Sequence, residues 1–188
     1  MSKDLSLIST EAPHRRPAVE GVLVLIGMMG VGKSTVGRIL AEKVGAEFVD
    51  TDQVIEERIG LSIKSIFSQR GEGYFRDRET EVLADALRCS GPLVVSVGGG
   101  AVGRPENKRL LNEANLVVWL RASPATIWSR IVDSVDRPLL ERGGLEGIIA
   151  LTHARSSDYA EVSTVVVDVD DLDIDRVVAD VLKCWQEL

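Results

Sequence analysis

Hydrophobic residues along the chain gather into five short runs that are separated by longer amphipathic stretches. The runs are rich in Val, Ile and Leu and have the length of strands, covering residues 22–26, 47–50, 93–97, 116–120 and 164–169. Their hydrophobicity is continuous rather than alternating, which is typical of strands covered on both faces. The stretches between them predict helices over residues 33–44, 53–59, 63–89, 105–113, 123–135, 146–158 and 173–187.

The alternation of strands and helices predicts an α/β fold. In this fold a parallel sheet of about five strands lies between helices on both faces, as a three-layer sandwich. Ligands of such sheets bind at the carboxyl ends of the strands. Residues 1–20 carry mixed charges and no apolar period, so we expect a flexible N-terminal tail before a single domain over residues 21–188. Residues 136–147 contain three glycines and no apolar period, which predicts a lid loop.

The charge of the chain is concentrated at its C-terminal end. The formal net charge is −7, and residues 161–188 carry −6 of it. The rest of the chain is nearly neutral, so a basic anion-binding pocket within it is compatible with the acidic total. The acidic balance and the aromatic content of 4% argue against nucleic-acid binding through basic faces and stacked rings. The longest uninterrupted apolar run, residues 22–26, is far below the ~20 residues of a membrane span, so we expect no membrane contact.

Cysteine usage indicates a reducing compartment. Cys89 and Cys184 are far apart and follow no metal-binding spacing, so neither a disulfide framework nor a zinc site is indicated. We therefore expect a cytoplasmic protein, and we take it to be a monomer.

The strongest functional signal is GMMGVGKST at residues 27–35, directly after the first predicted strand and at the start of a helix. It matches the phosphate-loop pattern GxxxxGK[ST], in which glycines let backbone N–H groups converge on phosphates and the helix start adds its positive dipole end. Lys33 would neutralise the β- and γ-phosphates, and the Ser34 hydroxyl would hold Mg²⁺. The candidate nucleotide-binding residues of this loop are Gly30, Val31, Gly32, Lys33, Ser34 and Thr35.

Carboxylates follow the second predicted strand, which ends in Asp50-Thr51-Asp52. This strand comes about one βαβ unit after the first, so we expect its end to emerge beside the phosphate loop. Residues two apart on a strand point to the same side, and one carboxylate would then serve the metal while the other serves an acceptor hydroxyl. The alternative is structural, with Asp52 acting only as the N-cap of the next helix.

Two further segments add to the acceptor side. Arg76 and Glu79 are one helical turn apart. Ion pairs at this spacing usually lie on the solvated surface of a helix and have no further role. The third predicted strand runs into the triple glycine 98–100, which suggests close approach of the backbone to a bound molecule.

Over residues 22–185 the chain resembles the shikimate kinase family. The resemblance rests on the phosphate loop, the aspartates 50 and 52, residues 71–76, the triple glycine, Arg137-Pro138-Leu139-Leu140, and Arg155 with Tyr159, all in the family's order. It implies a P-loop NTPase fold, with ATP and shikimate as substrates and Mg²⁺ as cofactor. The implied reaction is transfer of the γ-phosphoryl group of ATP to the 3-hydroxyl of shikimate.

The resemblance also implies roles on the acceptor side. Asp52 would contact the substrate hydroxyls as a catalytic residue, and Arg76 and Arg155 would clamp the shikimate carboxylate. The remaining acceptor residues are backbone or apolar wall positions, namely Gly98, Gly99, Gly100, Phe67 and Phe75.

On the donor side, the resemblance makes Lys33 catalytic and brings Arg137 from the lid to the phosphates as a further catalytic residue. Arg130 would lie against the adenine, and Asp50 would support Mg²⁺ through water, beside Ser34. The third strand has Ser96 near its end and no terminal aspartate of the Walker B type, so magnesium ligation depends on Ser34, the phosphates and Asp50.

Two other functions stay open from the sequence. Another small-metabolite kinase, such as a gluconate kinase, would share the phosphate loop and a nearby aspartate, but Arg76 and Arg155 together with the triple glycine distinguish the two. A nucleotide-gated binding module without catalysis is the second alternative, and intact Lys33, Ser34 and Asp52 speak against it.

Overall fold

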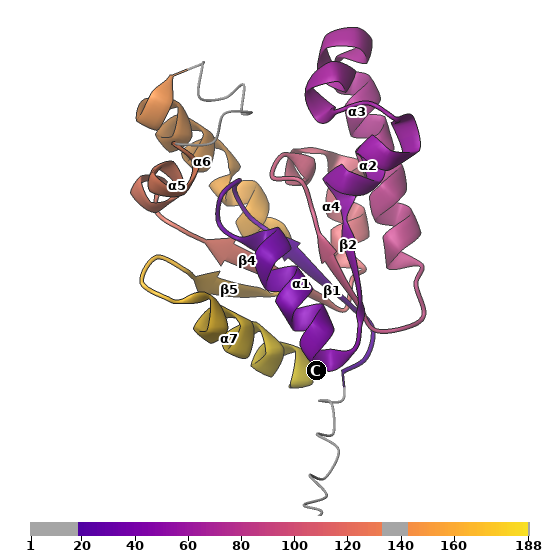
Figure 1. Cartoon of the computed structure of the whole chain (residues 1–188), viewed down its shortest axis with the longest axis vertical. Helices are drawn as coiled ribbons and strands as arrows, with labels where there is room; N and C mark the ends of the chain where they lie inside the picture. Colours follow the sequence, from indigo (N-terminus) through magenta and orange to yellow (C-terminus); the bar gives the residue numbers. More distant parts are fainter. Residues whose placement is uncertain (1–18, 133–142, 188) are drawn as a thin grey trace, which may run out of the picture.

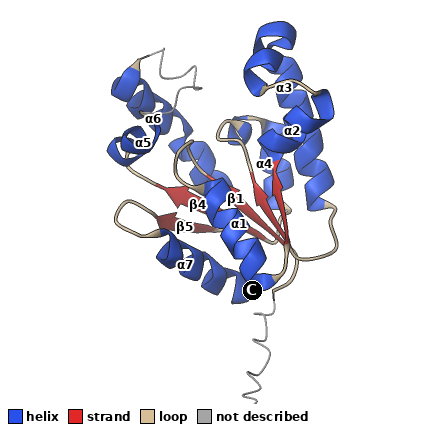
Figure 2. Cartoon of the chain, in the orientation of Figure 1, coloured by secondary structure: helices blue, strands red, loops and turns tan. Residues whose placement is uncertain are grey.

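The computed structural model describes residues 19–132 and 143–187, and a five-stranded sheet lies at its centre. All neighbouring strands are parallel, in the order β2-β3-β1-β4-β5. Figure 2 shows the strands side by side with helices in front of and behind them. The predicted three-layer α/β fold is therefore confirmed.

Burial differs between the inner and the outer strands. The strands are β1 (Val22–Ile26), β2 (Glu47–Asp50), β3 (Leu93–Ser96), β4 (Leu116–Arg121) and β5 (Val165–Asp168). The inner strands β3, β1 and β4 are buried throughout, apart from the last residue of β4, while the edge strands β2 and β5 are partly exposed. The inner three have the continuous hydrophobicity that two covered faces require.

Several helices begin at residues that favour a helix start. They are α1 (Lys33–Val44), α2 (Thr51–Ile59), α3 (Ile63–Leu87), the short 3₁₀ helix η1 (Ala101–Gly103), α4 (Pro105–Asn112), α5 (Pro124–Ile131), α6 (Gly144–Val162) and α7 (Ile174–Gln186). Ser62, Ser123 and Asp173 each accept a backbone N–H through their side chains at the starts of α3, α5 and α7. Pro105 and Pro124 stand in first turns, where no N–H is needed.

The helices divide into two layers and two projecting arms. Helices α1 and α7 lie on one face of the sheet, and α4 and α6 lie on the other (Figure 1). Beyond the carboxyl end of β2, helices α2 and α3 form an arm with its own small core, which consists of Ile55, Ile66, Phe75 and Val82. On the opposite side, α5 and the start of α6 rise beyond the end of β4 (Figure 1).

Helix α3 differs from the continuous helix expected over residues 63–89. Gly71 has φ 82° and ψ 167°, which breaks the helical path, and the helix ends at Leu87. A Cβ at Gly71 would meet no atom within 4 Å, so the positive φ rather than lack of space favours glycine there. Periodicity alone did not reveal this kink, because the spacing of apolar residues does not record φ.

The expected lid loop is shorter at its C-terminal end than the sequence indicates. Helix α6 begins at Gly144, and the Gly147 N–H donates to the Gly143 carbonyl at 3.0 Å, so residues 144–147 are helical. Positions 136–142, with Arg137, lie outside the described residues, and the lid stays a prediction.

The described chain is attached to the domain from its first residues. Val19 packs against the core, and the Trp185 Nε1–H of α7 donates to the Glu20 carbonyl at 2.9 Å, so the last two residues of the expected 1–20 tail belong to the folded part. Within residues 19–132 and 143–187, no helix has the length and apolarity that crossing a membrane requires.

Candidate active site

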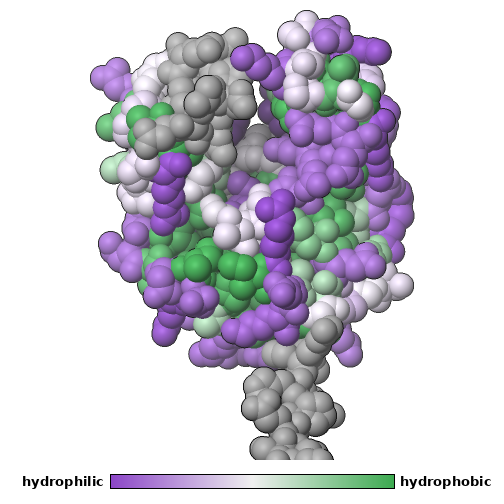
Figure 3. Space-filling model, in the orientation of Figure 1, coloured by the Kyte–Doolittle hydropathy of each residue, from purple (hydrophilic) through white to green (hydrophobic). Residues whose placement is uncertain are grey.

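A cleft of about 770 Å³ opens at the carboxyl ends of β1, β2 and β3, between the phosphate loop and the arm of α2 and α3. Figure 3 shows the surface hollowed beside this arm. The residues that line the cleft are Met29, Gly30, Gly32, Lys33, Ser34, Thr35, Asp50, Asp52, Glu56, Ile63, Phe67, Phe75, Arg76, Glu79, Ser96, Val97, Gly98, Gly99, Gly100 and Arg155. Most residues expected at the site thus lie in one cavity.

The phosphate loop presents an anion-binding helix start to this cleft. Gly30 and Gly32 adopt φ 77° and 99°, and no side chain caps the first turn of α1. The N–H groups of that turn therefore stay available for phosphate oxygens. The Lys33 ammonium donates to the carbonyls of Gly27 and Met28 at 2.9 and 3.0 Å, which holds the side chain across the loop.

Oxygen atoms suited to a hard cation stand next to the loop. The Ser34 hydroxyl donates to Asp50 Oδ2 at 2.5 Å, and its oxygen lies 3.3 Å from Ser96 Oγ. Ser96 is buried at the end of β3, which runs between β1 and β2, so Asp50 reaches the phosphate loop across one intervening strand. Carboxylate and hydroxyl oxygens beside a phosphate site are the donor set that Mg²⁺ prefers, so these residues fit the expected cation.

The helix cap after β2 is Asp50 and not Asp52. Asp50 Oδ1 accepts the backbone N–H groups of Asp52 and Gln53 at 3.2 and 3.4 Å, which makes it the N-cap of α2. Asp52 lies in the first turn of α2 and not on the strand. The prediction that Asp50 and Asp52 point to the same side because they are two apart on a strand is therefore wrong. Its carboxylate nevertheless lines the cleft together with Asp50.

Two carboxylates meet at Gly98. A Cβ there would lie 2.6 Å from Glu79 Oε1 and 2.8 Å from Asp52 Oδ1, so only glycine leaves room for both oxygens. Neither oxygen has a hydrogen-bond partner among the described residues. Burial, and secondarily the charge of Asp50, raises the pKa of Asp52 against the opposing influence of Lys33 and Arg76. The two carboxylates thus present unsatisfied acceptors beside the glycine turn.

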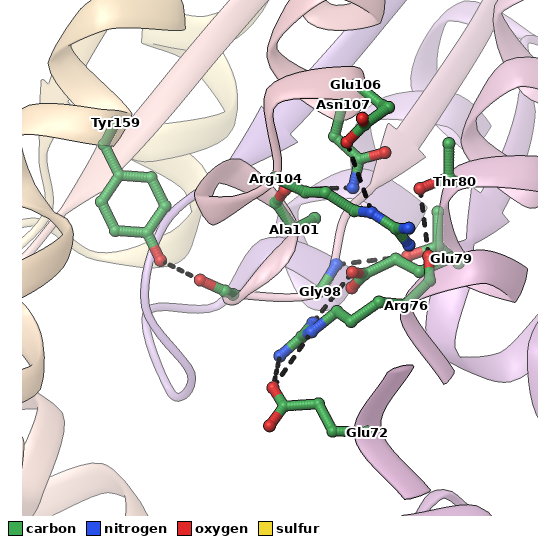
Figure 4. A network of polar contacts seen from close by, with 12 residues as sticks. Glu72, Arg76, Glu79, Thr80, Gly98, Ala101, Arg104, Glu106, Asn107 and Tyr159 are labelled. Atoms are coloured by element: carbon green, nitrogen blue, oxygen red, sulfur yellow. Dashed lines mark hydrogen bonds and ion pairs between the residues drawn. The ribbon is translucent and has the colours of Figure 1, made fainter. Parts of the chain in front are cut away.

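Arg76 and Glu79 form a pair inside the cleft, which corrects the expectation of a solvated surface pair. Glu79 is fully buried, and its Oε2 accepts from Arg76 Nη1 at 2.8 Å, while Glu72 Oε1 accepts from Arg76 Nη2 at 3.2 Å. Figure 4 shows the three side chains in a row beside Gly98. The pair is buried because the face of α3 that carries it packs toward η1 and α4, which helical spacing alone does not reveal.

Full burial also changes the titration of Glu79. Desolvation raises its pKa from 4.5 to about 7, although the Arg76 guanidinium opposes this shift. Between these values the folded protein holds a proton that the unfolded chain has released, so the free energy of unfolding falls as the pH rises. A shift of this size lowers the free energy of unfolding by about 3 kcal/mol between a pH below the unfolded pKa and a pH above the folded pKa.

We expect Glu79→Gln to remove this pH dependence. The stability of the variant relative to the wild type should rise from about pH 5 to about pH 8, since glutamine resembles the protonated acid. Urea unfolding of both unliganded proteins at the two pH values measures the difference. Glu81→Gln, which removes an exposed carboxylate from the same helix, is the matched control. A difference that is constant with pH contradicts the prediction.

Arg155 reaches the cleft from the opposite side. It projects from α6, is half-buried, and its Nη1 lies 4.0 Å from the Met28 sulfur in the phosphate loop. Arg76 and Arg155 therefore bring two guanidinium groups to one cavity from helices on opposite sides of it. At Gly100 a Cβ would lie 2.4 Å from Arg76 Nη2, so the glycine turn also makes space for this guanidinium.

Phe67 and Phe75 lie together on the arm, with ring centroids 4.8 Å apart. Phe75 is buried in the small core of the arm, while Phe67 is 36% exposed, and both line the cleft. They are placed as the apolar walls expected from the sequence, and their contact with a ligand stays a prediction.

Two expected nucleotide-binding residues lie outside the cleft lining. The Arg130 guanidinium donates to the carbonyls of Val31 and Val169 at 3.4 and 3.0 Å, so it links the phosphate loop to the segment after β5. Val31 belongs to the phosphate loop, but its side chain is buried and does not line the cleft. The contact of Arg130 with adenine stays a prediction.

Sequence reasoning assigned no role in the site to Glu79, Glu56 or Ile63. The Glu56 carboxylate accepts the Ile63 N–H at 2.7 Å and holds the turn between α2 and α3 at the edge of the cleft. No local pattern marks such a contact, because it depends on how the two helices meet. For Glu79 the only available signal was its spacing from Arg76 and the position of both near a glycine-rich segment.

Comparison with known proteins adds an independent line of evidence. A sequence model of the shikimate kinase family matches residues 29–186. The shikimate kinase of Moorella thermoacetica is 41% identical over 170 residues, covering 89% of this chain and 97% of that protein. The solved structure of shikimate kinase from Acinetobacter baumannii in complex with shikimate has a TM-score of 0.83 and 33% identity, covering 88% of this chain and 92% of that chain.

A gluconokinase from Sinorhizobium meliloti 1021 is similar in fold alone. Its structure covers 92% of this chain and 94% of its own length, with a TM-score of 0.59 and 22% identity. The likeness to the shikimate kinases is thus greater in both structure and sequence.

Proposed function

The chain belongs to the shikimate kinase family, and from this premise we propose that its cleft transfers the γ-phosphoryl group of ATP to the 3-hydroxyl of shikimate. The observation that carries the proposal is the meeting of two sites in one cavity. An anion-binding helix start lies at one end, and two guanidinium groups with an unpartnered carboxylate oxygen lie around the rest.

On the acceptor side, the planar guanidinium groups of Arg76 and Arg155 match a carboxylate, which each can bind through two parallel hydrogen bonds. Glycine at 98 and 100 leaves space for the side chains of Asp52, Glu79 and Arg76. Without side chains of its own, the segment from Gly98 to Gly100 would let the backbone approach the bound ring closely. The arm residues Phe67 and Phe75 supply apolar surface for the ring.

We propose that Asp52 orients the reacting hydroxyl and accepts its proton. Its Oδ1 has no partner among the described residues, and its raised pKa makes the carboxylate a better proton acceptor than a solvated one. Asp50 is engaged by the helix cap and by Ser34 and so takes no part in this step.

On the donor side, backbone N–H groups of the phosphate loop and Lys33 bind the phosphates and neutralise their charge. Within the described residues, no three His, Cys, Asp or Glu side chains form a group that could hold a metal ion by themselves. Ser34 and Asp50 would therefore hold Mg²⁺ together with the nucleotide. When bound, the ion supplies neutralisation of charge on the β- and γ-phosphates. Arg137 would add a further positive charge from the lid.

Gluconate kinase and a non-catalytic nucleotide-binding module are less well supported. Both would bind a nucleotide at the phosphate loop. A binding module does not account for an acceptor cleft in which Asp52 Oδ1 has no hydrogen-bond partner among the described residues. The arginines could also bind the carboxylate of gluconate, but gluconate has no ring to lie against Phe67 and Phe75. We further propose that the enzyme works as a monomer in the cytoplasm, in keeping with the free thiols of Cys89 and Cys184.

A coupled assay of ADP release tests the proposed function. We expect turnover with ATP, Mg²⁺ and shikimate, and turnover at least a hundredfold lower with gluconate, since gluconate presents a flexible chain in place of a ring to the paired arginines. Equal activity on both acceptors would favour a general hydroxy-acid kinase. ATP binding without turnover on any hydroxy acid would favour the binding module.

A further inference from the structure

We propose that Tyr159 is a positioning residue for the acceptor site, acting through the carbonyl of Gly99. The inference rests on the proposed function and extends it to a residue that does not line the main cleft. Tyr159 projects from α6 and is 1% exposed, and its hydroxyl donates to the Gly99 carbonyl at 2.6 Å. Figure 4 shows the ring reaching from α6 to the glycine turn.

The three carbonyls of the triple glycine have different partners. The Gly98 carbonyl accepts from the Ala101 N–H at 3.0 Å, and the Gly100 carbonyl accepts from the Gly103 N–H at 3.2 Å. These bonds belong to the turn that leads into η1. The Gly99 carbonyl is instead held by a side chain from another element, 60 residues away in the sequence. Tyr159 is thus an external restraint on the middle peptide of the turn.

Fixing this carbonyl also fixes an amide donor of the site. A peptide unit is planar, and its C=O and N–H point in opposite directions. When the Gly99 carbonyl is directed at Tyr159, the Gly100 N–H of the same peptide points away from α6. Arg76 and Glu79 lie on that side of the turn (Figure 4). The Gly100 N–H is therefore held toward the region in which Arg76 would bind the acceptor carboxylate.

Gly99 also lies against the phosphate loop. A Cβ at this position would be 3.2 Å from the Gly27 carbonyl oxygen and 3.5 Å from the Tyr159 hydroxyl. The Gly99 backbone therefore packs between the phosphate loop and α6, so the Tyr159 bond helps to set the spacing between the donor and acceptor halves of the cleft. Arg155 stands one turn before Tyr159 on the same helix.

The surroundings of Tyr159 make the restraint rigid. Its ring stacks on Trp119 of β4, with centroids 5.4 Å apart and planes inclined by 28°. Burial raises the pKa of the Tyr159 hydroxyl to about 12, although Arg155 opposes this shift, so the group stays protonated and remains a donor. Two aromatic rings thus hold one hydroxyl in place against a backbone that has no side chains of its own.

Tyr159→Phe removes this hydroxyl while it keeps the ring and the stacking. We expect the KM for shikimate to rise about three- to tenfold, the range that loss of one neutral hydrogen bond predicts, with a smaller fall in kcat. The dissociation constant of a non-hydrolysable ATP analogue should stay within twofold of the wild type, because no nucleotide contact is removed. Steady-state assays and calorimetry measure the two quantities.

Ser156→Ala is the matched control. It removes a hydroxyl from the same helix, where Ser156 Oγ donates to the Thr152 carbonyl within α6, without contact to the glycine turn. We expect its KM for shikimate to equal that of the wild type. A thermal melt of both variants shows whether either loses the fold.

A spectroscopic measurement tests the positioning without activity. The backbone amide resonance of Gly100 in the unliganded protein should shift in Tyr159→Phe and stay unchanged in Ser156→Ala. An unchanged Gly100 resonance overturns the proposal, and so does an equal loss of affinity for both substrates. If the wild type is inactive on shikimate, the proposed function fails, and the Gly100 resonance still decides whether Tyr159 orients the turn.

Discussion

Replacing Asp52 with asparagine is expected to lower kcat for shikimate phosphorylation by ~10²- to 10⁴-fold, the usual contribution of a positioned general base. The substitution keeps the shape of the side chain and its place in the first turn of α2. It removes the charge and the basicity of an oxygen that has no partner among the described residues and faces the glycine turn. The hydroxyl of the acceptor then loses its proton acceptor.

ATP binding should be retained in this variant. The contacts of the phosphate loop come from Gly30 to Thr35, and Asp52 lies in another element. Calorimetry with a non-hydrolysable ATP analogue and a coupled ADP assay separate the two effects. Glu57→Gln makes the same chemical change on the exposed face of α2 and serves as the control. A kcat for Asp52→Asn within twofold of the wild type would remove Asp52 from the mechanism and leave it a structural role in α2.

Replacing Arg76 with lysine should raise the KM for shikimate tens-fold or more, since charge-assisted hydrogen bonds contribute about 1.5 to 3 kcal/mol each. Lysine keeps the positive charge beside Glu79, but it cannot reproduce the planar fork that binds Glu79, Glu72 and an incoming carboxylate together. The loss should therefore fall on the acceptor and leave the KM for ATP nearly unchanged.

The neighbouring arginine provides the control for this substitution. Arg78 lies on the same helix and pairs with Glu81 at the surface, at 2.5 Å. Arg78→Lys should leave both KM values near those of the wild type. If Arg76→Lys damages both substrates equally, with a lower melting temperature, Arg76 supports the fold of the arm rather than the acceptor site.

The sequence was most informative where a function is encoded by neighbouring residues. The phosphate loop at residues 27–35 is one continuous segment, and its backbone geometry follows from its glycines and the helix that begins at Lys33. The inner strands were evident for a similar reason, because two covered faces demand unbroken Val, Ile and Leu. The resemblance to one family then came from the order of several such local motifs.

Prediction was weaker where a residue's role depends on what packs against it. The spacing of Arg76 and Glu79 is common on solvated helices, yet here Glu79 is fully buried. Asp52 was expected on a strand end, but α2 begins directly after β2, at Thr51, with Asp50 as its N-cap. The kink at Gly71 had no mark in the apolar pattern, since hydrophobic spacing does not record φ.

The sequence by itself determined the layered fold and the phosphate loop, because hydrophobic runs and the loop motif are local patterns. The order of several such motifs also led to the prediction that Asp52, Arg76 and Arg155 serve the acceptor. Only the tertiary structure decided that Glu79 is desolvated beside Gly98 and that Tyr159 holds the Gly99 carbonyl. Those two facts arise from contacts between separate elements, α3 with the glycine turn and α6 with the same turn. Burial and hydrogen bonding between distant segments depend on how helices pack around the sheet, and no local pattern of residues specifies that packing.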